Sequence, residues 1–194
     1  LQAFAAHSPA GVIVAGTERL ENLNTMVREA GCPVVQAIDC SLKLDGIAVG
    51  INHKQAAMAA TRHMLSQGYR RIAMMGCGND IRIRLRQSGY CEVMQQAGLF
   101  NEDMIIWQDG PPSIHVASRM IRRFLEKHPD VDGVVCQSDD LALGVIFECQ
   151  RLGIRVPEDF GICGFNDLEY AATTEPPLTT IRVPRFEIGY KAAD

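Results

Sequence analysis

Short apolar runs alternate along the chain with longer segments in which apolar residues recur at helical spacing. The run GVIVAGT is bounded by glycine and rich in β-branched residues, which favours a buried strand. The same pattern predicts further strands and intervening helices, with strands at 11–17, 32–39, 46–52, 70–76, 103–108, 132–137, 160–165 and 178–183 and helices at 18–30, 54–67, 84–97, 113–127, 139–152 and from 185 onward. Apolar strands joined by long crossovers are typical of an α/β fold with parallel sheets covered on both faces.

Ligands of such sheets bind outside the carboxyl ends of the strands. The residues that follow each predicted strand are therefore candidates for a binding site. These residues lie at 15–18, 36–39, 76–86, 108–113, 137–140 and 164–167.

The stretch QSDD at 137–140 allows three interpretations. Ser138 or Asp139 can cap the helix that follows, because both side chains accept hydrogen bonds from open N–H groups. A metal or phosphoryl site is disfavoured, because adjacent helical residues do not face the same way and no lysine follows the late strands before Lys191. Capping combined with ligand contact also accounts for the polar ends of the other strands.

Three arginines, Arg82, Arg84 and Arg86, follow in RIRLR at the entry of a predicted helix. They form either a solvated basic face or an anion clamp, because a guanidinium binds a carboxylate through two parallel hydrogen bonds. A pocket with arginine, serine, asparagine and aspartate suits a polyhydroxylated molecule, including an acidic one.

Charge and cysteine usage exclude several classes of protein. The 194 residues are 47% hydrophobic, enough for a core that can be split into two lobes, and the net charge of −4 does not predict a nucleic-acid surface. None of the seven cysteines forms a CxxC pair, which indicates reduced thiols and a cytoplasmic location rather than disulfides or zinc. We recognise no secretion signal and no nucleotide-binding motif, so no cofactor and no metal are expected.

Several blocks of sequence resemble one family. DDLALG, RVPEDF, GFND and PPLTTIRVP, all within 138–189, are similar to the effector-binding core of the lactose/galactose-repressor family, and 50–76 and 84–99 match the same family in order. FECQRLG and VGINHKQAA are most similar to its gluconate-utilisation repressor branch.

The resemblance implies a two-lobed fold like that of periplasmic sugar-binding proteins, seen here incomplete at both ends. Residues 1–49 would form part of the N-terminal lobe, residues 50–182 the C-terminal lobe, and residues 183–194 a crossover and the first part of a return helix. Family members also carry an N-terminal helix-turn-helix domain, which this chain lacks.

The resemblance further implies a repressor without enzymatic activity. The repressor would be a homodimer and would bind operator DNA through the helix-turn-helix domain. Its effector would be a sugar acid such as gluconate, or a phosphorylated relative, held between the lobes. The family's motifs carry the effector contacts over to Arg86, Ser138, Asn166, Arg82, Asp80, Ser113, Asp139, Thr17 and Gln36. Asn166 replaces the aspartate common in the family, which favours an acidic effector.

Two other functions stay open at this point. A sugar-acid-metabolising enzyme on a doubly wound α/β fold would need a general base with a perturbed pKa. A transport-type sugar-binding protein would be exported, which fits poorly with seven cysteines.

Overall fold

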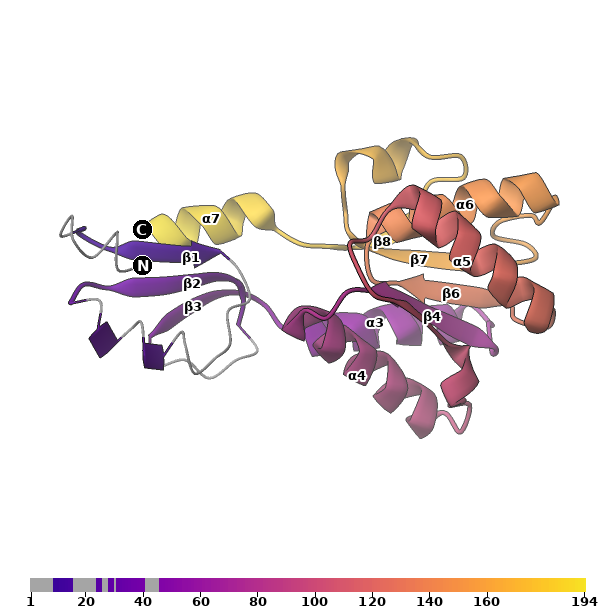
Figure 1. Cartoon of the computed structure of the whole chain (residues 1–194), viewed down its shortest axis with the longest axis horizontal. Helices are drawn as coiled ribbons and strands as arrows, with labels where there is room; N and C mark the ends of the chain where they lie inside the picture. Colours follow the sequence, from indigo (N-terminus) through magenta and orange to yellow (C-terminus); the bar gives the residue numbers. More distant parts are fainter. Residues whose placement is uncertain (1–8, 16–23, 26–27, 30, 41–45) are drawn as a thin grey trace. The chain divides into compact units, whose positions relative to one another are not determined.

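The computed structural model describes residues 9–15, 24–25, 28–29, 31–40 and 46–194. The helix predicted at 18–30 lies largely outside these residues. The chain divides into two compact units (Figure 1), unit 1 with Leu1–His53 and Pro184–Asp194, and unit 2 with Lys54–Val183. Within the described part, no helix is both long and apolar enough to cross a membrane.

In the described part of unit 1, a parallel three-stranded sheet packs against helix α7 (Arg185–Ala193). The strands follow chain order, β1 (Val12–Ala15), β2 (Val34–Asp39) and β3 (Ile47–Ile51). Helix α7 packs against β2 and β3. It buries Ile188 and Ala192 and so covers part of one face of this sheet.

Unit 2 is built on a sheet of five parallel strands in the order β5-β4-β6-β7-β8. The strands are β4 (Ile72–Cys77), β5 (Ile105–Gln108), β6 (Gly133–Cys136), β7 (Gly161–Asn166) and β8 (Thr179–Arg182). The helices are α3 (His53–Ser66), α4 (Ile81–Gln96), α5 (Ile114–Lys127) and α6 (Asp139–Leu152), with short turns η1 (Glu102–Met104) and η2 (Glu169–Thr173). The predicted α/β class with parallel sheets is confirmed.

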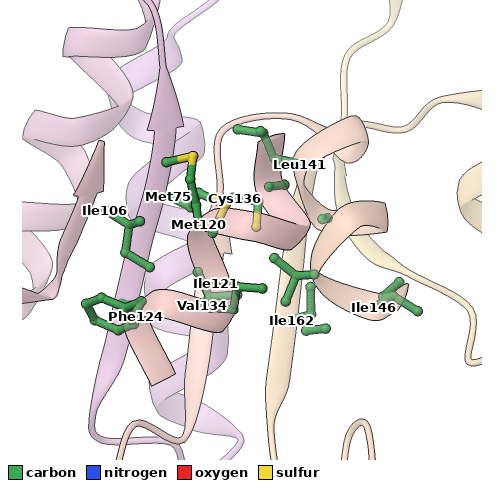
Figure 2. Packing of buried hydrophobic residues seen from close by; sticks show 14 of the residues in the cluster. Met75, Ile106, Met120, Ile121, Phe124, Val134, Cys136, Leu141, Ile146 and Ile162 are labelled. Atoms are coloured by element: carbon green, nitrogen blue, oxygen red, sulfur yellow. The ribbon is translucent and has the colours of Figure 1, made fainter. Parts of the chain in front are cut away.

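The two faces of this sheet carry separate apolar cores, because successive strand residues point to opposite sides. Ala73, Met75 and Cys77 of β4 join the core under α5 and α6, where Met75 lies close to Met120 and Cys136 (Figure 2). Ile72 and Met74 of the same strand join the core under α3 and α4. Burial of each large apolar side chain contributes about 1.5–3 kcal/mol, so both helix layers are held firmly to the sheet.

Two helix starts in unit 2 bear on the site. Helix α6 runs from Asp139 to Leu152 as predicted, with Ser138 as N-cap and Gly153 in the left-handed conformation (φ 70°) at its end. Helix α4 begins at Ile81, three residues earlier than predicted, because Asp80 caps it through a hydrogen bond from the Arg82 N–H (2.8 Å). Arg82 therefore lies in the first turn of helix α4.

Candidate functional site

A pocket of about 200 Å³ opens at the carboxyl ends of β4, β6 and β7, all in unit 2. Its lining residues come from strand ends and from the helix starts that follow, namely Cys77, Asp80, Arg82, Ile83, Arg86, Pro112, Gln137, Ser138, Leu141 and Asn166. This is the edge of the sheet at which parallel α/β folds bind ligands. Five of the predicted contacts meet here: Asp80, Arg82, Arg86, Ser138 and Asn166.

Arg86 is the buried arginine of the pocket. It is 8% exposed, its Nη1 donates to the Gln137 carbonyl, and its guanidinium carbon lies 3.6 Å from the centroid of the Phe165 ring. A cation over an aromatic face is attracted by the negative face of the ring. The stacking and the hydrogen bond together fix the plane of the guanidinium, as bidentate recognition of a carboxylate requires.

The other two arginines are placed differently. Arg82 forms an ion pair with Asp80 (Nη2 to Oδ2, 2.6 Å) at the pocket wall, whereas Arg84 is exposed and its Nε donates to Asn79 Oδ1 (2.9 Å). The lining residues thus include two arginines and one aspartate, a formal charge of +1. A pocket of this charge favours an anion.

Ser138 and Asn166 place neutral polar groups in the same pocket. The Ser138 Oγ accepts from the Leu141 N–H (3.3 Å), so the capping role predicted for it is present. Asn166 ends β7 with a φ of 120°, a conformation that few residues other than glycine adopt. Ser138 and Asn166 line the pocket together although they are distant in sequence.

The two carboxylates after Ser138 do not reach the pocket lining. Asp139 is fully buried, and its oxygens accept from the Leu168 N–H (2.7 Å) and the Thr180 hydroxyl (2.6 Å). Asp140 accepts from the Tyr170 hydroxyl (2.6 Å), and burial together with this bond raises the pKa of Tyr170. The direct effector contact predicted for Asp139 is therefore not supported by its placement, because both of its oxygens already bind this chain.

This arrangement also bears on the metal interpretation of the acidic pair. The Asp139 and Asp140 carboxylates point to different partners rather than to one ion. Within residues 9–15, 24–25, 28–29, 31–40 and 46–194, no group of three or more metal-ligating side chains gathers.

Ser113 and Gln36 are not among the residues that line this pocket. Ser113 caps α5 by accepting from the Val116 N–H (3.2 Å), while its neighbour Pro112 lines the pocket. Gln36 is buried in β2, which belongs to unit 1. Thr17 lies outside the described residues.

Five lining residues were not among the predicted contacts, namely Cys77, Ile83, Pro112, Gln137 and Leu141. The Gln137 carbonyl accepts from Arg86 Nη1, and the Gln137 side-chain Nε2 donates to the Ile83 carbonyl (3.3 Å). Phe165 stacks on Arg86, and Cys77 ends β4. Cys77, Gln137 and Phe165 all fall within the strand-end segments at 76–86, 137–140 and 164–167, so their position after a strand indicated them. Phe165 is not among the lining residues, and its contact with Arg86 connects it with the pocket.

The groups at the pocket suit the binding of a small molecule. Cys77 is the one thiol among the lining residues, and burial raises its pKa, which keeps it protonated and a poor nucleophile. The arginine, amide and hydroxyl groups instead suit an anion that also carries hydroxyl groups.

A second pocket of unit 2, of about 220 Å³, lies at the amino ends of β7 and β8. Its wall is formed by prolines and aliphatic side chains together with His63, Gln67, Tyr69 and Thr179. No arginine or carboxylate lines it. The pocket at the carboxyl ends of the strands, which has charged side chains in its lining, is therefore the better candidate for binding an anion.

Comparison with known proteins gives consistent matches. The family model of the periplasmic binding protein-like domain matches residues 61–194. The HTH-type transcriptional regulator GntR of Pseudomonas aeruginosa is 36% identical over 191 residues, which cover 98% of this chain and 56% of that protein. The chain thus spans about half the length of the curated relatives it matches.

Solved structures give the same result. The transcription regulator GntR from Chromobacterium violaceum superposes with a TM-score of 0.90 at 39% identity, over 99% of this chain and 70% of that one. A LacI-family transcriptional regulator from Silicibacter pomeroyi superposes with a TM-score of 0.91 at 34% identity, over 100% of this chain and 58% of that one.

Proposed function

Because the chain belongs to the periplasmic binding protein-like domain family, in the form that LacI-family regulators carry, we propose that it is the effector-binding core of a ligand-responsive transcriptional repressor. The relatives are transcriptional regulators, and the pocket chemistry supports binding rather than turnover. The complete protein would act in the cytoplasm and contact operator DNA through a helix-turn-helix domain outside this chain.

The effector is a sugar acid such as gluconate, or a phosphorylated relative. The observation that carries this proposal is the placement of Arg86, buried and oriented in a pocket whose lining has a formal charge of +1. Asn166 supports it, because a carboxylate at that position would repel an anion. Arg86 would bind the effector carboxylate through two hydrogen bonds, and Ser138 and Asn166 would bind its hydroxyl groups.

The remaining contacts are proposed on the family resemblance. Arg82 and Asp80 would bound the pocket as an ion pair, and Gln36 and Thr17 would contribute from the N-terminal lobe. An effector can change DNA binding only if it binds one arrangement of the repressor more tightly than the other.

The test is a paired calorimetric titration of the full-length protein. Gluconate and 6-phosphogluconate are compared with glucose and galactose at two salt concentrations. We expect the acids to bind more tightly, by about 1–2 kcal/mol relative to the neutral sugars, and their affinity to fall as salt rises. Tighter binding of a neutral sugar would overturn the assignment of the effector class.

We also propose that the regulator is a homodimer, as the family resemblance implies. The face of unit 2 formed by α6 and η2 supports this, because Phe147 is exposed there beside a hollow of about 340 Å³ lined by Leu143, Ile146, Gln150 and Tyr170. Light scattering on the full-length protein measures the mass directly. A monomer at micromolar concentration would contradict the proposal, and Phe147→Asp should shift a dimer toward monomer.

A further inference from the structure

The corner that follows β7 holds two adjacent residues in an unusual backbone conformation. Asn166 has a φ of 120° and Asp167 a φ of 55°, although neither is glycine. Such conformations are strained for residues with a side chain and persist only where the surroundings enforce them. Asn166 is also the residue of this corner that lines the pocket.

A network of hydrogen bonds centred on Asp139 encloses this corner. The Asp139 carboxylate accepts from the Leu168 N–H (2.7 Å) and from the Thr180 hydroxyl (2.6 Å). The Thr180 Oγ1 in turn accepts from the Asp167 N–H (3.3 Å). Both residues that follow Asn166 are thus tied, directly or through one hydroxyl, to a single buried carboxylate.

Gly164 allows this carboxylate to come close to the strand. A Cβ added at Gly164 would overlap Asp139 Oδ1, so only glycine leaves room for the group at this point of β7. Asp139 directly follows Ser138 at the start of helix α6. This helix start therefore places Ser138 at the pocket, and through Asp139 it also anchors the corner that carries the second pocket residue, Asn166.

We propose that Asp139 and Thr180 are positioning residues, which set the affinity for the effector by holding the Asn166 amide at the pocket. Neither residue contacts the effector itself; both act on it by positioning Asn166. The inference rests on the proposed function, since it requires that an effector bind Asn166. It also gives Asp139 an indirect role in place of the direct contact that its sequence position predicts.

A purely structural role for the network predicts a different outcome. In that case, loss of the Thr180 hydroxyl would reduce the stability of the fold and leave the affinity of the folded protein unchanged. Substitutions of Asp139 are expected to disrupt folding, because the residue is fully buried and binds two elements. Thr180 is partly exposed and is therefore the better site for a test.

The experiment is a double-mutant cycle on gluconate affinity in the full-length protein. Thr180→Val removes the hydroxyl and retains the shape, Thr180→Ser restores the hydroxyl, and Asn166→Ala removes the amide. All titrations are made well below the unfolding temperature of the least stable variant. We expect Thr180→Val to weaken gluconate binding by on the order of tenfold, the effect of losing a hydrogen bond to a charged group. Thr180→Ser should remain within about threefold of wild type.

The cycle separates positioning from simple stability. If Thr180 acts through Asn166, Thr180→Val should change affinity by less than about twofold in the Asn166→Ala background. A full tenfold loss in that background, or unchanged affinity in the single variant, would overturn the inference.

A readout that needs no effector separates the inference from the proposed function. Amide exchange at Asp167 and Leu168 should accelerate in Thr180→Val and stay slow in Thr180→Ser. If wild type binds neither gluconate nor 6-phosphogluconate, the proposed function fails, and the exchange rates still decide whether the network holds the corner. Unchanged exchange in Thr180→Val would count against the positioning role regardless of what binds.

Discussion

The guanidinium of Arg86 is stacked on the ring of Phe165, with the guanidinium carbon 3.6 Å from the ring centroid. Phe165 directly precedes Asn166, so the residue that orients the arginine and the residue that presents the amide are neighbours in β7. The end of strand β7 therefore orients the Arg86 guanidinium through Phe165 and also presents the Asn166 amide to the pocket.

Replacement of Arg86 should reduce effector binding strongly. Arg86→Lys keeps the charge and removes the planar pair of donors, and Arg86→Ala removes both. We expect losses in binding free energy of about 2–4 kcal/mol for Arg86→Ala and a smaller loss for Arg86→Lys, measured by calorimetry with gluconate. Arg84→Ala is the matched control, because Arg84 is exposed and bonds to Asn79, and its affinity should equal that of wild type. Equal losses in Arg84→Ala and Arg86→Ala would show that the arginines act only as a diffuse charge.

Asn166→Asp should weaken or remove the preference of the pocket for an anion. The new carboxylate lowers the formal charge of the lining from +1 to zero and repels an acidic effector. Aspartate tolerates a positive φ as asparagine does, so the corner should keep its conformation. We expect gluconate affinity to fall by about 1–2 kcal/mol at low salt, with a smaller effect at high salt. Glucose, titrated in parallel, should lose no affinity, and an equal loss for both ligands would indicate that the substitution damaged the pocket.

Gly164→Ala should destabilise unit 2. The added methyl group would overlap Asp139 Oδ1 and displace the carboxylate from its two partners. The free energy of unfolding should fall by about 1–3 kcal/mol, the range for overpacking of a filled site. Gly189→Ala is the matched control, because nothing lies within 4 Å of its added Cβ in helix α7. That variant should unfold at the same or a slightly higher denaturant concentration, since alanine favours helix by about 0.5–1 kcal/mol.

Glu148 should make the stability of unit 2 depend on pH in the acidic range. Burial raises its pKa, but hydrogen bonds from Ser118, Arg151 and Arg122 more than offset this, so its pKa lies below the ordinary value of 4.5. A carboxyl group whose pKa is lowered by folding stabilises the protein at pH values above its ordinary pKa. The stabilisation is lost as the pH falls through the lower value of the folded state.

Glu148→Gln removes this titration and provides the comparison. At pH 7 the free energy of unfolding should be lower in Glu148→Gln than in wild type by about 1–3 kcal/mol, the range for hydrogen bonds to a charged group. The difference should shrink between pH 5 and pH 3 in urea titrations. A difference that stays constant over this range would contradict the assignment of the pH dependence to Glu148.

Much of the fold follows from the spacing of apolar residues. Helix α6 has the predicted bounds, because Ser138 caps one end and Gly153 ends the other, and both signals are local in the chain. Helix α4 starts earlier than predicted, because Asp80 caps it. Arginines alternate with apolar residues in its first turn, so helical spacing could not be recognised there.

The sequence by itself also determined which strand ends would carry the site, since parallel strands bring their carboxyl ends to one edge. The order of the strands and the family motifs predicted Arg86, Ser138 and Asn166 as contacts, and the structure brings these three residues together at one pocket. The tertiary structure alone decided where each polar side chain points. Asp139 accepts hydrogen bonds from Leu168 and Thr180, Arg84 donates to Asn79 at the surface, and Arg86 contacts Gln137 and Phe165. For Asp139 and Arg86 the partners lie 29 to 79 positions away along the chain, and no local pattern encodes such contacts. A side chain adopts the direction in which its charge finds partners, and those partners exist only once the sheet has brought distant segments together.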